Sequence, residues 1–228
     1  MSIEKLKMLG FRNYKEKSLE FSPGVNVIWG ENGSGKTATL EAIHILSVGR
    51  SFRTAKLQET IEKNSPHSRL VGVFVSEKKK KEVGVSLNSG LPKHGTRGFL
   101  DTLKNNRQKD IVFGYTTTGP HTDKPAVLYN GKNIRSVGSQ GEHKISLVLI
   151  KLAEYRLIRE GTKTTPTVLL DDLFATLDFE RSDAVFALLE KNTQTIITNT
   201  DLVDIKNHGI VIDGKTNKSI HLLRQCKN

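Results

Sequence analysis

Residues 30–37, with the sequence Gly-Glu-Asn-Gly-Ser-Gly-Lys-Thr, constrain the fold of this chain more than any other stretch. They fit the phosphate-loop pattern G-x-x-x-x-G-K-[ST] and lie between a β-prone run at 24–29 and a helical pattern that extends to about Val48. Glycines let backbone N–H groups turn inward around phosphate oxygens. Lys36 would neutralise the β- and γ-phosphates, and the Thr37 hydroxyl would hold Mg²⁺. We expect the Lys36 ammonium to be exposed when no nucleotide is bound.

A second motif, Asp171-Asp172, follows the apolar run at 168–170. This order is typical of a buried strand whose carboxyl end faces the nucleotide beside the phosphate loop. Asp171 would then be a metal partner, and Asp172 would position or deprotonate the attacking water. The alternative is an ordinary turn, because Asp-Asp pairs are common after strands.

A third motif, at 139–142, reads Ser-Gln-Gly-Glu and opens a long helical pattern. Ser139 and Glu142 also fit the capping box S-x-x-E, which explains both residues without any chemistry. The capping box leaves Gln140 and Gly141 unexplained. A helix N-terminus with a free hydroxyl can bind a γ-phosphate, but the phosphate loop already has its own helix. We therefore expect this segment to serve a nucleotide that is held by a second subunit.

The alternation of strands and helices predicts an α/β fold with largely parallel strands. In the last third of the chain we expect a helix at 142–160, a strand at 168–170, a helix at 180–190 and a strand at 195–198. Elsewhere we expect strands at 3–8 and 18–21, the end of the first helix at Gly49, a short helix at 99–107, and a hairpin from 126–129 to 132–135 around Asn130-Gly131.

Two further β-rich runs, 70–76 and 82–87, predict a hairpin with Lys78 to Lys81 at its tip. A solvated turn is the simpler interpretation of four adjacent lysines, and a tip that contacts phosphate is the alternative.

The charge of the chain is strongly unbalanced, with 35 Lys and Arg against 24 Asp and Glu and a net charge of +11. This excess favours a polyanionic partner, either nucleic acid or an anionic membrane surface. The single Cys226 excludes an intrachain disulfide and an all-cysteine metal site, and favours a reducing compartment. No apolar run approaches the ~18 residues that span a bilayer, and the first residues carry no signal-peptide core. We therefore expect a soluble cytoplasmic protein with no membrane partner.

Taken together, the phosphate loop, the Ser-Gln-Gly signature, the Asp-Asp strand and the Leu177-Asp178 turn resemble the ATPase head of the ABC and SMC-like class. Within that class the chain closely resembles the RecF family of bacterial DNA replication and recombination-repair proteins. The matching stretches are LKMLGFRNYKE at 6–16, WGENGSGKTATLEAIHILSVGRSFR at 29–53, RGFLD at 97–101, NRQKDI at 106–111, TTTGPHTD at 116–123, GSQGEHK at 138–144 and LLDDLFATLD at 169–178.

The resemblance implies an ABC/SMC-type P-loop ATPase head, with a mixed sheet, flanking helices and an antiparallel β subregion. It implies that Lys36 and Asp172 are catalytic, and that Thr37 and Asp171 hold Mg²⁺. Thr198 stands where many ABC-type ATPases place a γ-phosphate-sensing His, so that sensing role is expected to be weak. The implied ATP-binding residues are Arg12, Asn13, Gly30, Asn32, Gly33, Ser34, Gly35, Lys36, Thr37, Ala38, Ser139, Gln140, Gly141, Asp178 and Thr198.

The chain also departs from the RecF pattern. Family members carry a helical arm between the segments that resemble RGFLD and NRQKDI, whereas only residues 102–105 lie between them here. We therefore expect a single ATPase head over 1–228, with a shortened junction at 88–110 in place of the arm. The family's GPH-Arg-Asp-Asp reads His121-Thr122-Asp123-Lys124 in this chain.

By resemblance, we expect a slow Mg²⁺-dependent ATP hydrolase that dimerises on ATP, holds duplex or gapped DNA and assists recombinase loading. Its setting would be DNA repair, replication, recombination and the SOS response, with other recombination-mediator proteins as partners. One alternative is a nucleotide-gated interaction module without significant hydrolysis. Another is a transporter-type ABC ATPase subunit, which would need a membrane partner or a coupling surface, and the net charge of +11 suits DNA better.

Overall fold

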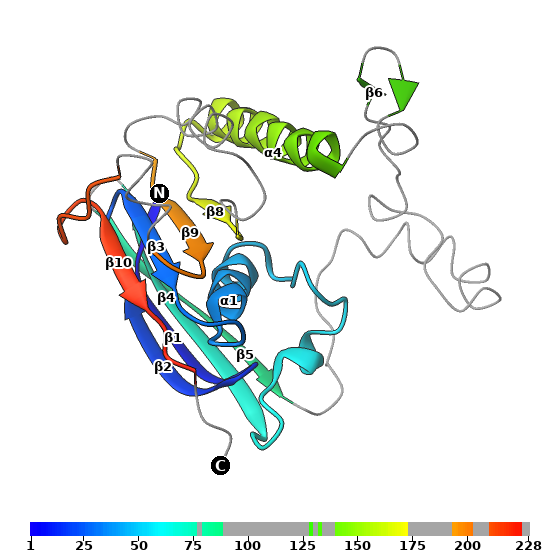
Figure 1. The fold of residues 1–228 in the computed structure, drawn as a ribbon. Helices are drawn as coiled ribbons and strands as arrows, with labels where there is room; N and C mark the ends of the chain where they lie inside the picture. Colours follow the sequence, from blue (N-terminus) through cyan, green and yellow to red (C-terminus); the bar gives the residue numbers. More distant parts are fainter. Residues whose placement is uncertain are drawn as a thin grey trace. The chain divides into compact units, whose positions relative to one another are not determined.

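The computed structural model describes residues 1–76, 79–88, 128–129, 132–133, 140–172, 193–202 and 210–224 (Figure 1). The chain divides into two compact units. One combines Met1–Ser89 with Lys144–Asn228, and the other is Gly90–His143. In the smaller unit the described strands are β6 (Leu128–Tyr129) and β7 (Lys132–Asn133), which pair as an antiparallel hairpin.

The larger unit contains an antiparallel sheet with the order β2-β1-β4-β5. Its strands are β1 (Ser2–Phe11), β2 (Tyr14–Glu20), β4 (His67–Ser76) and β5 (Lys79–Asn88). Apolar and polar residues alternate along β1 and β4, because one face of the sheet packs against the core and the other faces water.

The second sheet of this unit is parallel and has the order β10-β3-β9-β8. It is formed by β3 (Val25–Trp29), β8 (Val168–Leu170), β9 (Thr195–Asn199) and β10 (Lys218–His221). β3 and β9 are almost completely buried, as expected for central strands of a parallel sheet.

Helix α1 (Lys36–Val48) belongs to the core that both sheets share. It is buried on most of its circumference and ends at Gly49, whose left-handed φ of 74° closes the last turn. The buried apolar residues around it come from β1, β4, β3 and β9, and include Leu6, Met8, Leu70, Ile28 and Ile196.

A buried amide, Gln194, connects the start of β1 to the parallel sheet. Its Nε2 donates to the Ile3 carbonyl (2.7 Å) and the Ser22 carbonyl (2.8 Å), and its Oε1 accepts from the Ile3 N–H (2.8 Å) and the Thr167 hydroxyl (3.0 Å). Because every hydrogen-bonding position of the amide is used, its burial carries no unpaired polar group. Nearby, Tyr155 of α4 (Gln140–Thr162) hydrogen-bonds the Thr193 hydroxyl at 2.7 Å.

The structure confirms the predicted α/β fold with an antiparallel subregion, the first helix with its end at Gly49, the long helix that begins at the Ser-Gln-Gly motif, and the strands at 168–170 and 195–198. The expectation of largely parallel strands was wrong, because among the described strands only those of the β10-β3-β9-β8 sheet are parallel. The hairpin of 70–76 with 82–87 is also confirmed, but the placing of Lys79 to Lys81 at its tip was wrong, and Lys78 lies outside the described residues. Lys79 to Lys81 lie in β5, where the ladder continues to the pair Ser76 and Lys79, and Lys80 forms an ion pair with Glu4 at 2.7 Å. The 3₁₀ helix η1 (Leu57–Thr60) was not predicted.

Other predictions lie outside the described residues. These are the helices at 99–107 and 180–190 and nearly all of the shortened junction at 88–110. None of the helices in the described part of the chain combines the length and the apolar composition that a membrane crossing requires.

Candidate nucleotide site

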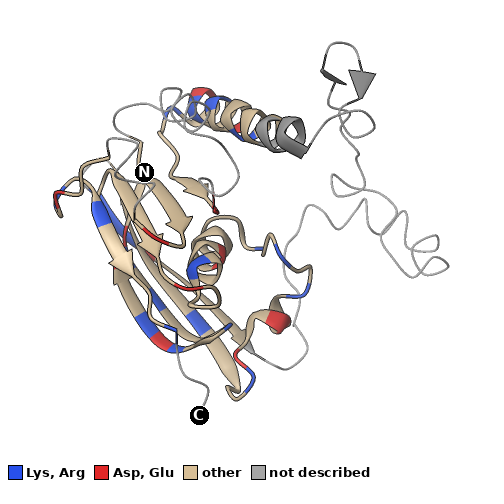
Figure 2. Cartoon of the chain, viewed as in Figure 1, with Lys and Arg blue, Asp and Glu red and all other residues tan. Residues whose placement is uncertain are grey.

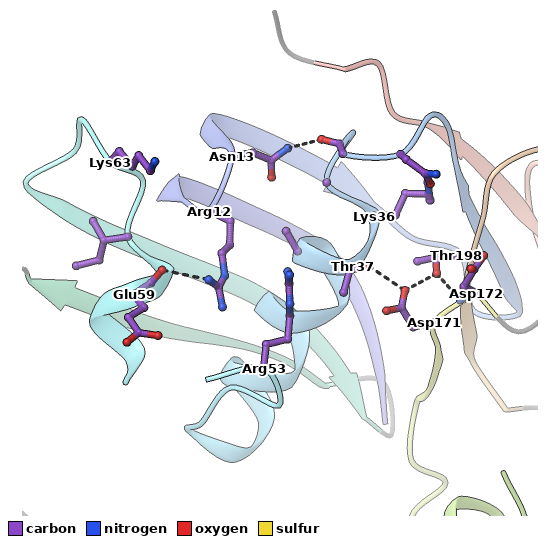
Figure 3. A pocket seen from close by; sticks show the side chains of 15 residues that line it. Arg12, Asn13, Lys36, Thr37, Arg53, Glu59, Lys63, Asp171, Asp172 and Thr198 are labelled. Carbon is purple, nitrogen blue, oxygen red and sulfur yellow. Dashed lines mark hydrogen bonds between the residues drawn. The ribbon is translucent and has the colours of Figure 1, made fainter. Parts of the chain in front are cut away.

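The topology of the parallel sheet brings three motifs to one place. The phosphate loop follows β3, Thr198 lies near the end of β9, and Asp171 follows β8. β9 lies between β3 and β8, and parallel strands end at the same edge of a sheet. These segments therefore line one pocket of about 620 Å³ (Figure 3). Its lining residues are Arg12, Asn13, Asn32, Gly33, Gly35, Lys36, Thr37, Ala38, Arg53, Glu59, Ile61, Lys63, Asp171, Asp172 and Thr198.

The loop itself has the backbone conformation that the motif predicts. Gly30, Gly33 and Gly35 have φ values of 145°, 84° and 104°, which residues with a side chain rarely adopt. At Gly35 a Cβ atom would also collide with the Tyr14 ring. Glycine is therefore required at this position for its conformation and for the space that it leaves.

The expected exposure of Lys36 was wrong. Lys36 is 9% exposed, and its Nζ donates to the carbonyls of Gly30 (2.6 Å) and Glu31 (3.1 Å). The ammonium folds back onto its own loop because a buried cation needs acceptors. These same bonds hold it at the pocket, beside the place where the loop motif puts phosphate.

A chain of hydrogen bonds joins the predicted metal and catalytic residues. Asp171 Oδ1 accepts from the Thr37 hydroxyl at 3.2 Å and from the Thr198 hydroxyl at 2.6 Å. Thr198 Oγ1 in turn accepts from the backbone N–H of Asp172 at 2.8 Å. One hydroxyl thus fixes the side chain of Asp171 and the backbone of Asp172, which has a left-handed φ of 53°. This positioning role of Thr198 was not predicted from the sequence.

The FRNY segment holds the phosphate loop from the other side. Asn13 Nδ2 donates to the Gly33 carbonyl at 3.3 Å, and the Tyr14 hydroxyl lies 3.3 Å from both the Ser34 carbonyl and Thr39 Oγ1. Burial raises the pKa of Tyr14, although the Thr39 hydrogen bond lowers it in part. The phenol therefore stays protonated at neutral pH and can donate to the loop.

Arg12 lines the pocket as predicted, but its guanidinium is already engaged by protein groups. It forms a bidentate pair with Glu41, with Nε–Oε2 at 2.8 Å and Nη2–Oε1 at 2.5 Å, and its Nη1 donates to the Glu59 carbonyl at 3.1 Å. Sequence reasoning missed Glu41, as well as the lining residues Arg53, Glu59, Ile61 and Lys63. The signal for Arg53 was present, because GRSFR belongs to the stretch that carries the family resemblance.

Ser139 and Asp178 lie outside the described residues, so the proposed signature across a dimer stays a prediction. Gln140 and Gly141 form the first residues of α4, which agrees with a helix that begins at this motif.

The residues present fit a nucleotide with Mg²⁺. The buried Oδ1 of Asp172, a residue that lines the pocket, has no hydrogen-bond partner within the described part of the chain, and neither has the buried Oγ of Ser34 in the phosphate loop. Such atoms are costly unless a ligand or water satisfies them. Among the same residues there is no cluster of three or more His, Cys, Asp or Glu that could hold a metal alone. A hydroxyl and one carboxylate are nonetheless a usual set for Mg²⁺, which also takes phosphate oxygens and water.

The fold and the loop define an ABC/SMC-type P-loop ATPase head. The chain belongs to the family described as RecF/RecN/SMC N terminal domain, whose model matches residues 2–208. Within that family the chain is RecF-like. It is 31% identical over 207 residues to the DNA replication and repair protein RecF of Chlorobium phaeovibrioides, an alignment that includes 89% of this chain and 53% of the relative.

The RecF of Clostridium novyi is 25% identical over 345 aligned residues, which include 91% of this chain and 95% of the relative. That alignment exceeds the 228 residues of this chain by 117, so the relative has at least 117 residues without a counterpart here. The place of the missing segment, at 88–110, stays a prediction.

Solved structures support the fold. The structure of the recombination mediator protein RecF-ATP in the RecFOR pathway has a TM-score of 0.71 at 19% identity, covering 90% of this chain and 95% of that one. An SMC head bound to the C-terminal winged-helix domain of ScpA has a TM-score of 0.57 at 20% identity, covering 90% and 91%. At these identities the likeness is one of fold.

Proposed function

We propose that this chain is a Mg²⁺-dependent ATPase that acts on DNA in recombinational repair. The observation that carries the proposal is the chain of hydrogen bonds from Thr37 through Asp171 and Thr198 to Asp172 at the mouth of the phosphate loop. It brings a metal-binding hydroxyl, a metal-binding carboxylate and a second carboxylate together at one edge of the sheet, as ATP hydrolysis requires.

Each residue has a distinct task in the proposed reaction. The loop N–H groups and Lys36 hold the β- and γ-phosphates, and Thr37 and Asp171 hold Mg²⁺, which neutralises negative charge on the phosphate oxygens when it is bound. Asp172 Oδ1 orients the attacking water and accepts its proton. Thr198 fixes the position of the two aspartates relative to each other, through its bonds to the Asp171 side chain and the Asp172 backbone. Asn13 and Tyr14 keep the loop in its phosphate-binding shape.

Metal removal tests this assignment. Purified protein is expected to hydrolyse ATP with Mg²⁺ and to lose that turnover when EDTA replaces the metal, because Thr37 and Asp171 alone leave the phosphate charge unbalanced. Phosphate release is the measurement, and added MgCl₂ should restore it. Turnover that persists in EDTA would contradict the Thr37 and Asp171 assignment.

The proposed partners are a second copy of the chain, which would supply the Ser139 signature across two bound ATP molecules, and duplex or gapped DNA. Relatives named for DNA replication and repair support DNA as a partner, as does the net charge of +11. Figure 2 shows Lys and Arg spread over the strands of the antiparallel sheet, with Asp and Glu among them. The solvent face of this sheet includes Lys7 and Arg69, for which the described residues provide no ion pair. These two cations are therefore available to phosphates.

DNA binding is expected to be ATP-stimulated, to show little sequence preference and to weaken with salt. Each neutralised phosphate contributes about −0.9 to the log–log slope, so about four contacts predict a loss of about 100-fold between 50 and 200 mM salt. Fluorescence anisotropy of a labelled duplex, with and without ATP, measures this. If the protein bound no DNA at any salt concentration, the nucleotide-gated interaction module would be the better-supported function. A lack of ATP hydrolysis would favour the same module.

A further inference from the structure

The fully buried carboxylate of Glu41 is not accounted for by the proposed reaction. Glu41 is the acidic residue of α1, lies five positions after Lys36, and has a side chain that is 0% exposed. Burying a carboxylate is costly unless charged partners and hydrogen bonds satisfy it. Its partners come from two segments that line the nucleotide pocket, the turn after β1 and the loop after α1.

Glu41 holds two arginines of the pocket wall in different ways. Arg12 is held firmly, because its bidentate pair with Glu41 is joined by the Nη1 bond to Glu59 and a backbone N–H bond to the Thr60 carbonyl at 2.6 Å. Arg53 approaches Glu41 Oε2 at 3.8 Å, and its side chain is 48% exposed. In Figure 3 the Arg53 side chain extends toward the pocket between Arg12 and Thr37.

A hydroxyl completes the arrangement. Ser51 Oγ donates to Glu41 Oε1 at 2.5 Å and accepts from the backbone N–H groups of Arg53 (2.9 Å) and Thr54 (3.1 Å). Through Ser51, the carboxylate also fixes the backbone from which Arg53 extends. A carboxylate has about four acceptor positions, and Arg12 and Ser51 use three of them. The remaining position, on Oε2, faces Arg53. Glu41 therefore attracts the Arg53 guanidinium without holding it in a short hydrogen bond.

We propose that Glu41 is a positioning residue that orients Arg12 and Arg53 toward the polyphosphate of the bound nucleotide. This inference rests on the proposed ATPase function. Two guanidinium groups share one carboxylate, so the pair keeps a net charge of +1 at the pocket wall. An oriented cation pair favours the more highly charged ligand, so Glu41 contributes to the preference for ATP over ADP.

Three possible roles of Glu41 predict different changes in triphosphate affinity for the variant Glu41→Gln. If Glu41 orients the arginines, the variant binds a triphosphate more weakly, because the neutral amide cannot accept both Arg12 bonds and the Ser51 hydroxyl. If Glu41 only neutralises excess charge, the variant binds a triphosphate more tightly, because the pocket gains one positive charge. If Glu41 only stabilises the fold, the thermal midpoint falls while the affinity of the folded protein is unchanged.

Calorimetric titration with a non-hydrolysable ATP analogue and with ADP, each with Mg²⁺, distinguishes these possible roles. We expect Glu41→Gln to weaken the analogue about tenfold, which corresponds to loss of about one charge-assisted contact, and to weaken ADP by less. Glu62→Gln is the matched control. It removes the same charge from a side chain that bonds Asn64 and Ser65 and does not contact either arginine.

A double-mutant cycle with Arg53→Ala completes the test. If Glu41 acts through Arg53, the loss for the analogue in the double variant is smaller than the two single losses combined. The inference would be overturned if Glu41→Gln bound the analogue as tightly as wild type or more tightly, or if the losses of the two single variants were additive in the double variant. In either case, binding of the analogue by the wild-type protein would leave the ATPase proposal intact. If Glu41→Gln does not fold, Glu41→Asp replaces it. That variant keeps the charge and shortens its reach by one methylene, so wild-type affinity for the analogue would overturn the inference equally.

Discussion

Replacing Lys36 with alanine is expected to lower ATP affinity about 100-fold or more. Lys36 is the cation that the loop holds at the phosphate position, and charge-assisted hydrogen bonds to two phosphates contribute about 1.5–3 kcal/mol each. Because 1.4 kcal/mol is a factor of ten, two such bonds account for about a hundredfold or more. Calorimetric titration of ATP with Mg²⁺ measures the change.

The same substitution is expected to leave the fold intact. The carbonyls of Gly30 and Glu31, which Lys36 satisfies, belong to a loop that lines the open pocket, so water can replace the ammonium. Lys215→Ala is the matched control, because it removes the same charge from an exposed residue that does not line this pocket. Equal ATP affinity in wild type and Lys36→Ala, with Lys215→Ala unchanged, would contradict the phosphate-loop assignment.

Much of the site could be predicted because its motifs are contiguous in the sequence. The loop at 30–37 fixes its own conformation through glycines, and the apolar run before Asp171 identifies a parallel strand that ends at the nucleotide edge. This strand is half-buried and not buried as expected. Local pattern and fold rules are sufficient for such features.

The rest depends on which strands become neighbours and in which register. Thr198 meets Asp171 only because β9 separates β3 from β8, and the residue type alone does not reveal that its hydroxyl reaches both aspartates. Glu41 looks like a solvated helix residue in the sequence, yet α1 packs between two sheets and buries that position. The lysines of β5 were misplaced for a similar reason, since the ladder register and not the charge decides where the strand begins.

Replacing Asp172 with asparagine is expected to preserve ATP and Mg²⁺ binding and to slow hydrolysis on the order of 10²-fold. The amide is nearly isosteric with the carboxylate and keeps the backbone N–H bond to Thr198, so the left-handed turn at Asp172 can persist. What is lost is an oxygen that accepts a proton from the attacking water. Asp172 Oδ1 is buried and has no partner in the described part of the chain. This oxygen is therefore the place where we expect an incoming water to be held. Single-turnover phosphate release measures the chemical step.

Thr198→Val provides the comparison that separates chemistry from positioning. Valine removes the hydroxyl that joins Asp171 and Asp172 but leaves both carboxylates, so hydrolysis should slow by less than in Asp172→Asn while Thr198→Ser stays close to wild type.

If ATP closes a dimer, Asp172→Asn should accumulate that dimer in sedimentation. Ser139→Arg in the same background should prevent the dimer without weakening ATP binding, because a bulky cation at the helix start blocks the second subunit. Unchanged turnover in Asp172→Asn would assign the role of general base to Asp171 or to the substrate itself, since the reaction would then not use the carboxylate of Asp172.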